Sequence, residues 1–249
     1  MQPPTFTGQH ALFLDFDGTL VDLAERPERV RPDPQLPELL RACQRRLGGA
    51  LALLSGRRLE SIDDLLPGLQ LPGAGLHGAQ RRERPGGPVT ELAAATGLAT
   101  GLRERSAAYP GLWVEDKGAA LAIHYREAPE LSVLALELLY DAVQGSGLRI
   151  VSGKCVHEAR PPAFDKGQAL REFMLRPPFA GRVPLFAGDD RTDEDAIRAA
   201  QQLGGAAIKV GPGPSGADHR LVDPQALLLW LRAGARIASP GARVEETTS

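Results

Sequence analysis

The chain has 249 residues, of which 43% are hydrophobic and 24% are charged, and its formal net charge is -2 at pH 7. It is long enough for one large α/β domain or for a core domain with a smaller insert, and its composition is that of an ordinary folded protein. The small net charge and the lack of a lysine and arginine run argue against nucleic acid or an anionic membrane as a partner.

The start of the chain, MQPPTFTGQH, has neither the cationic nor the apolar segment of a secretion signal. No apolar stretch reaches the roughly 18 residues that cross a membrane. We therefore expect a cytoplasmic protein. Cys43 and Cys155 are far apart and lack metal-ligand spacing, so neither a disulfide nor a zinc site is expected.

The first predicted elements are a strand, a helix and a strand. Residues 11–14 form a short apolar run that stops at acids and glycine, as a buried strand of a parallel sheet does. Leucines at helical spacing predict a helix over 36–47, and a second apolar run predicts a strand over 50–54. Such a unit has a right-handed crossover, and its ligands bind at the carboxyl ends of the strands.

The alternation changes in the middle of the chain, which predicts an inserted domain over residues 81–160. Gly, Pro and charged residues predict a linker and hinge over 81–88, and 160–164 is the second predicted hinge. The elements expected between them are a helix over 91–108, paired strands within 112–125, a helix over 129–143 and strands within 148–159.

The strand and helix alternation then returns, so that residues 1–80 and 161–249 form the predicted core. Its later elements are a helix from Lys166, a strand over 183–187, a helix from Asp193, a strand over 206–210 and a helix from Pro224, with a loose tail after Gly234. The predicted fold class is α/β, with a Rossmann-like core, a parallel sheet and a smaller α+β insert.

Two aspartates, Asp15 and Asp17, follow the first strand and precede Gly18 and Thr19. Residues two apart in an extended chain project to the same side, so one carboxylate can attack a group while the other handles protons. A calcium loop would need Asp or Asn at position 19 and a later Glu, which are missing. An ordinary acidic turn is the alternative that remains.

Ser55, Gly56 and Arg57 follow the second strand. The serine can cap the next helix, or its hydroxyl and the following N–H groups can bind a phosphate. Lys166 begins a helix that Asp165 caps, and there a cation opposes the helix macrodipole by about 0.3–1 kcal/mol. Neutralising a phosphoryl group would account for that position, and a solvated surface lysine is the alternative.

Asp189 and Asp190 follow the strand over 183–187, while Thr192 and Asp195 form a capping-box pattern. Carboxylates this close together repel one another unless a cation joins them, and oxygen ligands suit Mg²⁺. Phosphate monoester hydrolysis needs accelerations up to about 10²¹, roughly 28 kcal/mol, whereas one positioned donor supplies only about 3 or 4. A metal, a nucleophile, an acid/base and a cation together would be sufficient.

Four segments, ALFLDFDGTL, ALLSGR, DKGQAL and FAGDDRTDED, resemble in sequence and order the motifs of the haloacid dehalogenase-like phosphatases. The resemblance implies that Asp15 is the nucleophile and that Asp17 is the general acid and base. It implies that Ser55 and Lys166 bind the phosphoryl group. Mg²⁺ would be held by Asp15, the Asp17 carbonyl and Asp189, supported by Asp190 and Asp193, and further substrate contacts would come from Gly18, Thr19, Gly56 and Arg57.

Further segments, GLHGAQRR, EDKGAALAIHYREAP, GKCVHEARP and GDDRTDE, resemble the bacterial trehalose-6-phosphate phosphatases, in which the insert is a cap that contacts the sugar. This resemblance implies hydrolysis of trehalose 6-phosphate in trehalose biosynthesis. Gln80 departs from the glutamate expected in many relatives. The implied contacts to trehalose are Lys117, Lys154 and Glu158, and, with less weight, His77, His124 and Arg126; a solvated sheet face is the alternative.

Other functions remain as alternatives. A phosphatase for another sugar phosphate or a phosphohexomutase would share the same core, and a receiver-like phospho-acceptor module would use a similar set of residues. A receiver needs no inserted domain and has no second acid two residues after its nucleophile. The run Gly73–Gly78 matches GxGxxG, but no helix is predicted after it, so a dinucleotide site is not expected. We expect a monomer.

Overall fold

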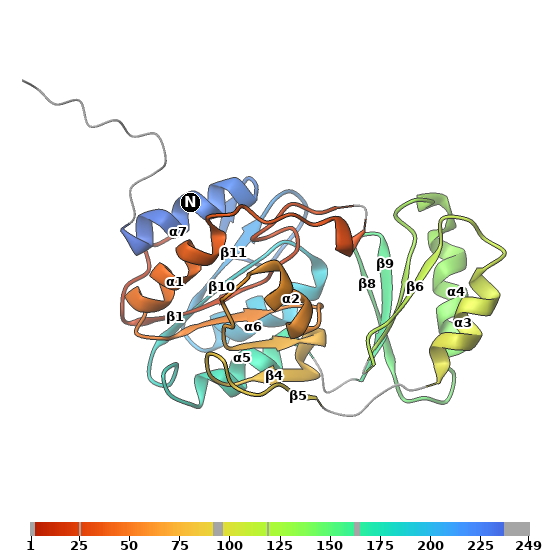
Figure 1. Ribbon diagram of the computed structural model, residues 1–249, viewed down its shortest axis with the longest axis horizontal. Helices are drawn as coiled ribbons and strands as arrows, with labels where there is room; N and C mark the ends of the chain where they lie inside the picture. Colours follow the sequence, from red (N-terminus) through yellow and green to blue (C-terminus); the bar gives the residue numbers. More distant parts are fainter. Residues whose placement is uncertain (1–2, 25, 92–96, 119, 162–164, 237–249) are drawn as a thin grey trace, which may run out of the picture.

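Two β-sheets of different size organise the chain (Figure 1). The computed structural model describes residues 3–24, 26–91, 97–118, 120–161 and 165–236. We call the larger sheet with its helices the core, and the smaller sheet with its two helices the cap. The apolar side chains of the core form one buried cluster and those of the cap form a separate one.

The core sheet has eight strands in the order β12-β11-β10-β1-β2-β3-β4-β5. Pairing is parallel from β12 to β3 and antiparallel for β4 and β5. In the centre, Leu12 pairs with Leu185 on one side and with Leu51 on the other. The strands are β1 (His10–Leu14), β2 (Leu51–Leu54), β3 (Gly73–Gly75), β4 (Gln80–Arg82), β5 (Thr90–Glu91), β10 (Val183–Gly188), β11 (Ala206–Val210) and β12 (His219–Leu221).

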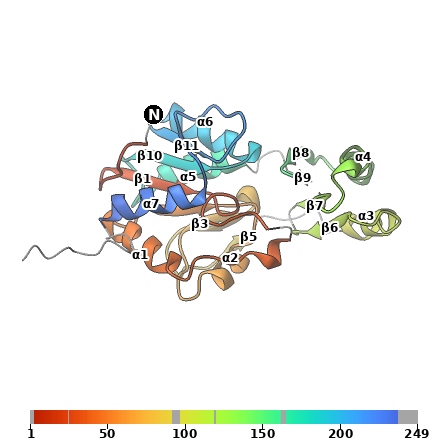
Figure 2. The ribbon, with the colours of Figure 1, turned by 90° about the horizontal axis from the view of Figure 1, so that it is seen from above.

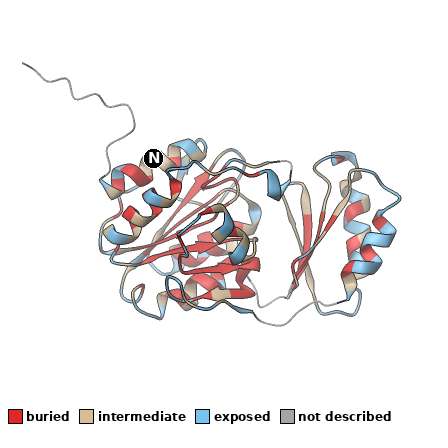
Figure 3. Cartoon of the chain, in the orientation of Figure 1, coloured by how far each residue is buried: buried red, intermediate tan, exposed pale blue. Residues whose placement is uncertain are grey.

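Helices cover both faces of the core sheet, which explains why its central strands are apolar throughout. Figure 2 shows α1 and α6 on opposite faces, and α1 contacts α7 while α5 contacts α6. Figure 3 shows that the buried residues concentrate in the strands between these layers. The core helices are α1 (Leu36–Arg46), α2 (Leu59–Leu65), α5 (Lys166–Met174), α6 (Glu194–Gln202) and α7 (Pro224–Ala235), with short 3₁₀ turns η1 (Pro27–Arg29), η2 (Leu76–Gly78) and η4 (Arg191–Asp193).

The cap is a four-stranded antiparallel sheet, in the order β6-β7-β9-β8, with two helices on one face. Figure 1 shows that its other face is turned toward the core. The cap elements are α3 (Leu98–Ser106), β6 (Trp113–Asp116), β7 (Leu121–His124), η3 (Pro129–Leu131), α4 (Ser132–Ala142), β8 (Arg149–Gly153) and β9 (Val156–Arg160).

The strands and helices that the sequence predicts are present among the described residues. β4 and β5 pair with the core sheet, which the sequence pattern did not predict. Such strands of two or three residues show no periodicity that could have revealed them. The division into a core of residues 1–80 and 161–249 and an insert of residues 81–160 stays a prediction. The described part of the helix expected over 91–108 begins at Leu98. Residues 92–96, the hinge residues 162–164 and the tail 237–249 lie outside the described residues.

Two sequence interpretations concern other features of the fold. After β3 the chain enters η2 and then the antiparallel strand β4, so no helix follows the GxGxxG run. Cys43 and Cys155 are both free cysteines, and Cys43 is buried. None of the described helices has the length and apolar character needed to cross a membrane.

Candidate active site

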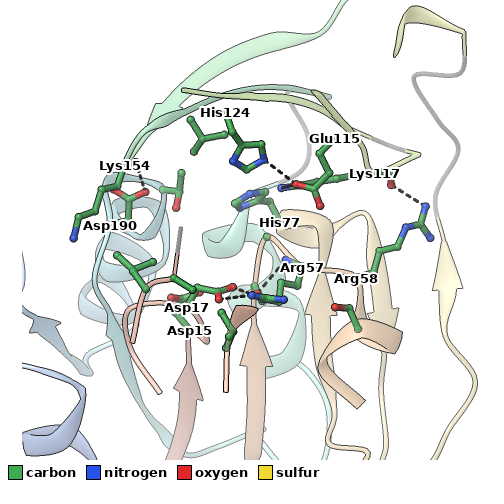
Figure 4. A pocket seen from close by; sticks show the side chains of 18 of the residues that line it. Asp15, Asp17, Arg57, Arg58, His77, Glu115, Lys117, His124, Lys154 and Asp190 are labelled. Atoms are coloured by element: carbon green, nitrogen blue, oxygen red, sulfur yellow. Dashed lines mark hydrogen bonds and ion pairs between the residues drawn. The ribbon is translucent and has the colours of Figure 1, made fainter. Parts of the chain in front are cut away.

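A cavity of about 370 Å³ lies between the carboxyl ends of the central core strands and the cap (Figure 4). The core side contributes Asp15, Asp17 and Lys166, while Lys117 and Lys154 come from the cap. This volume is in the range of small-molecule sites. Because the central strands are parallel, the residues that follow each of them gather at this one edge of the sheet.

Asp15 sits directly after β1 and is almost fully buried. Its main-chain N–H donates to the carbonyl of Ala187 at 2.9 Å, which continues the pairing with β10. Lys166 Nζ donates to Asp15 Oδ1 at 2.6 Å and the Thr19 hydroxyl donates to Oδ2 at 3.1 Å. Burial raises the pKa of Asp15 to about 7. The attraction of Lys166 lowers this pKa, and the repulsion of Asp193 raises it further.

Lys166 is the first residue of α5, and Asp165 caps that helix by accepting from Gln168 N at 2.7 Å. The ammonium group is buried and also donates to Asp193 Oδ1 at 2.5 Å. Burial alone would lower the pKa of Lys166, but the attraction of Asp15 and Asp193 raises it. Lys166 is therefore a buried cation at neutral pH, and a surface lysine is excluded.

Asp193 organises the loop after β10. Its Oδ2 accepts from the main-chain N–H groups of Asp189 and Asp190, each at 2.9 Å, while Oδ1 accepts from Lys166. The Asp190 side chain also accepts from the main-chain N–H of Arg191 at 2.7 Å. Asp190 and Asp193 form a capping box, in which each side chain accepts from the main-chain N–H of the other residue. The sequence interpretation of the capping box as Thr192 with Asp195 is therefore wrong. The box is formed by Asp190 and Asp193, because the 3₁₀ turn η4 precedes the helix.

The carboxylates of Asp15, Asp189 and Asp193 offer oxygen atoms within 4.8 Å of one another. Asp15 and Asp189 line the cavity, whereas Asp193 does not and holds Lys166 and the loop N–H groups instead, so Asp15 and Asp189 are the candidate metal ligands. Burial raises the pKa of Asp189 to about 9, followed by repulsion from Asp15 and Asp193. The two carboxylates therefore do not both ionise readily unless a cation joins them, and such an oxygen donor set fits Mg²⁺.

Gly18 makes room for this pair of carboxylates. Its φ is +78°, and a Cβ atom at this position would lie 2.2 Å from Asp189 Oδ2. Lys209 of β11 binds the same loop, since its Nζ donates to the main-chain carbonyl of Asp189 at 2.5 Å. Sequence reasoning missed Lys209, although a lysine within the apolar strand AAIKV was a signal that could have found it.

Ser55 and Arg57 follow β2. Ser55 is buried, its N–H donates to Ala74 O at 2.9 Å, and its hydroxyl oxygen accepts from Arg57 N at 3.1 Å. The Arg57 guanidinium donates to both carboxylate oxygens of Asp17, at 2.6 Å and 2.7 Å. This places the side chain of Asp17 beside Arg57, and Figure 4 shows the pair at the floor of the cavity.

The cap contributes a chain of polar contacts above the cavity. Lys117 Nζ donates to Glu158 Oε2 at 2.6 Å, and Glu115 Oε2 lies 3.0 Å from His124 Nε2. Although burial opposes it, ionisation of Glu158 is favoured by His77 and Lys117, which lower its pKa well below the usual range. Figure 4 shows Glu115, Lys117 and His124 over His77.

Most of the residues that the sequence singled out line this cavity. They are Asp15, Asp17, Ser55, Gly56, Arg57, His77, Lys117, His124, Arg126, Lys154, Lys166, Asp189 and Asp190. Gly18, Thr19, Glu158 and Asp193 are not among its lining residues. Sequence reasoning missed Glu115 and an apolar side formed by Leu23, Ala24, Val30 and Leu65. The spacing of Glu115 two residues before Lys117 in a strand could have indicated a shared face.

The chain is similar to known proteins over most of its length. A family model described as trehalose-phosphatase matches residues 13–223. A probable trehalose-phosphate phosphatase from Sinorhizobium fredii is 45% identical over 81% of this chain and 78% of the relative. A trehalose-6-phosphate phosphatase from Escherichia coli is 36% identical over 92% of this chain and 88% of the relative.

Solved structures share the fold. A trehalose-6-phosphate phosphatase related protein is 26% identical, with a TM-score of 0.74 over 90% of this chain and 96% of that one. A haloacid dehalogenase-like hydrolase from B. subtilis is 15% identical, with a TM-score of 0.61 over 89% of this chain and 98% of that one. The second likeness concerns the fold alone.

Proposed function

This chain belongs to the trehalose-phosphatase family and has the haloacid dehalogenase-like fold, and we propose that it hydrolyses trehalose 6-phosphate through a phosphorylated Asp15. The observation that supports this most directly is the position of the Asp15 carboxylate. It is buried at a strand end, accepts a hydrogen bond from Lys166, and faces a cavity that the lysines of the cap border on the other side.

The reaction has two steps. In the first, an Asp15 carboxylate oxygen attacks phosphorus, the bond from phosphorus to the sugar oxygen breaks, and Asp17 gives that oxygen a proton. In the second, Asp17 takes a proton from a water molecule that attacks the aspartyl phosphate, which releases phosphate and restores Asp15. Splitting the reaction this way lets one pair of carboxylates serve both steps.

The buried cation Lys166 and the Ser55 hydroxyl would bind the phosphoryl oxygens. Asp15, Asp189 and the Asp17 main-chain carbonyl would hold Mg²⁺, which when bound neutralises phosphoryl charge. Asp193 holds Lys166 and the loop of Asp189 in fixed positions relative to each other, because it accepts hydrogen bonds from both. Because Asp17 is paired with Arg57 in this structure, its carboxylate must leave part of that pair to reach the departing sugar oxygen.

At the sugar end, Lys117 and Lys154 of the cap offer cationic donors to hydroxyl groups of the substrate. The apolar side of the cavity, with Leu23, Val30 and Leu65, suits the carbon face of a sugar ring. Cytoplasmic location and a monomeric state remain predictions from the sequence.

The test is a substrate panel measured by phosphate release, with Mg²⁺ and with EDTA. We expect trehalose 6-phosphate to be hydrolysed far faster than sucrose 6-phosphate, glucose 6-phosphate or p-nitrophenyl phosphate, and EDTA to abolish turnover. Equal rates across the panel would discard the trehalose assignment, and full activity in EDTA would discard the magnesium site.

Variants of the two aspartates test the mechanism. Asp15→Asn removes the nucleophile and should abolish phosphate release, and Asp17→Asn should lower kcat about 10²–10⁴-fold. The matched control is Asp22→Asn, which changes an exposed aspartate that does not line the cavity. Unaltered turnover in Asp17→Asn would remove its role in proton transfer.

A further inference from the structure

The core and the cap meet above the cavity through His77 and Glu158. His77 belongs to η2 of the core and Glu158 to β9 of the cap, and His77 Nε2 lies 2.9 Å from Glu158 Oε1. The other carboxylate oxygen accepts from Lys117 at 2.6 Å. His77 and Lys117 line the cavity, whereas Glu158 lies behind them. The sugar side of the cavity is thus tied to the core through a buried carboxylate.

The core determines where the His77 ring lies. Its main-chain N–H donates to the carbonyl of Ser55 at 2.9 Å, so the residue is anchored to the loop at the phosphate end. Its φ is 56°, in the left-handed region that few non-glycine residues adopt. The ring packs against Gly56, where a Cβ atom would lie 2.6 Å from His77 Nε2. The positive φ sets the direction of the side chain, and Gly56 leaves the space that the ring occupies.

The charges show what the ring does there. Burial lowers the pKa of His77 to about 4, so the imidazole is neutral at pH 7. Two acceptors at 2.9 Å would repel, so Nε2 carries the hydrogen that faces the Glu158 carboxylate. Glu158 Oε1 is buried and has no hydrogen-bond partner among the described residues, so its 2.9 Å contact with His77 Nε2 is a polar contact without hydrogen-bond geometry. This contact is the electrostatic compensation that His77 offers the carboxylate. An uncompensated buried carboxylate oxygen is costly.

We propose that His77 is a positioning residue, which holds Glu158 and through it Lys117 in the place from which Lys117 meets the sugar. This rests on the proposed function, because Lys117 is assigned there to the sugar hydroxyls. Glu158 is not among the residues that line the cavity, so the role assigned to it here is to hold Lys117, which is one of them. Loss of the His77 contact would let the carboxylate, and with it the Lys117 ammonium, move away from the substrate.

A matched pair of variants tests the proposal. His77→Gln can place an amide N–H near the position of Nε2, whereas His77→Asn is too short to reach Glu158. Asparagine tolerates a positive φ better than glutamine does, so stability should favour His77→Asn. For both variants, kcat and KM are measured with trehalose 6-phosphate and with p-nitrophenyl phosphate, which has no sugar.

We expect the ratio of kcat/KM for trehalose 6-phosphate to that for p-nitrophenyl phosphate to fall about tenfold in His77→Asn, mostly through KM, because a buried carboxylate loses its polar contact. His77→Gln should keep most of the ratio although it is the less stable variant. In a double-mutant cycle, Glu158→Gln should add little to His77→Asn.

Three outcomes would overturn the proposal. They are an unchanged ratio in His77→Asn, an equal ratio in the two variants, and losses that follow thermal stability instead of side-chain reach. These outcomes are distinct from a failure of the proposed function, which would appear as a wild-type protein that does not prefer trehalose 6-phosphate.

Discussion

Asp17 and Arg57 form a two-point ion pair across the ends of β1 and β2. Arg57 Nε donates to Asp17 Oδ2 at 2.6 Å and Nη2 donates to Oδ1 at 2.7 Å, and the Arg57 side chain is only 10% exposed. The pair joins the proposed acid and base to the loop that carries Ser55. It therefore holds the Asp17 carboxylate beside the cavity, from where one oxygen turns from Arg57 to the leaving oxygen or the water.

Arg57→Lys keeps the cation but removes the planar fork that binds both oxygens of Asp17. We expect kcat/KM for trehalose 6-phosphate to fall about tenfold or more, because a bidentate pair is replaced by a point charge. Arg41→Lys is the control, since that arginine bonds to the carbonyl of Gly68 on the surface. Equal kinetics of the Arg57→Lys and Arg41→Lys variants would show that the two-point geometry has no role.

Lys166→Met would leave Asp15 and Asp193 buried without their shared cation. Breaking such a buried pair costs about 3–5 kcal/mol of the free energy of unfolding, and phosphate release should be lost as well. Urea denaturation measures the first effect. Lys154→Met, at an exposed lysine, should leave the free energy of unfolding nearly unchanged. If the Lys166→Met protein keeps the free energy of unfolding of the wild type, the ion pairs of Lys166 with Asp15 and Asp193 do not stabilise the fold.

Gly18→Ala should weaken metal binding, because the added Cβ meets the Asp189 carboxylate. Gly181 is a matched control: its φ is +76°, close to the +78° of Gly18, but nothing lies within 4 Å of a Cβ atom there. Gly181→Ala should therefore show only the backbone strain, on the order of 1 kcal/mol. Calorimetric titration with Mg²⁺ compares the two. If the Gly18→Ala and Gly181→Ala variants bind Mg²⁺ with the same affinity, Asp189 is not a metal ligand whose position depends on the space at Gly18.

Acid should destabilise the protein through His77. Its pKa is lowered from 6.5 to about 4 by burial, so between these pH values the unfolded chain binds a proton that the folded chain does not. The stabilisation is present above pH 6.5 and is lost as the pH falls toward 4. Three charged groups also act on the pKa of His77: Glu158 raises it, whereas Arg160 and Lys117 lower it.

Urea denaturation of the wild type and of His77→Gln at pH 7 and pH 5 isolates the histidine contribution. The free energy of unfolding should fall more steeply with acid in the wild type than in the variant, because glutamine does not titrate. Parallel pH profiles would show that the ring is already accessible to protons in the folded state.

The sequence by itself determined the core alternation and the residues that follow its central strands. Asp15, Ser55 and Asp189 each come directly after an apolar run, and parallel strands bring such positions to one edge whatever the rest of the chain does. The pattern is local, so it can be recognised without knowing which side chains meet.

Only the tertiary structure decided the partners. Asp17 meets Arg57, 40 residues away in the chain, and Asp193 is held by Lys166 at a distance of 27 residues. Glu158 of the cap contacts His77 of the core and Lys117, and the short strands β4 and β5 join the core sheet. Ion pairs between buried groups depend on how distant segments pack. Strands of two or three residues are defined by the strands they pair with. Neither feature leaves a periodic signal in the sequence.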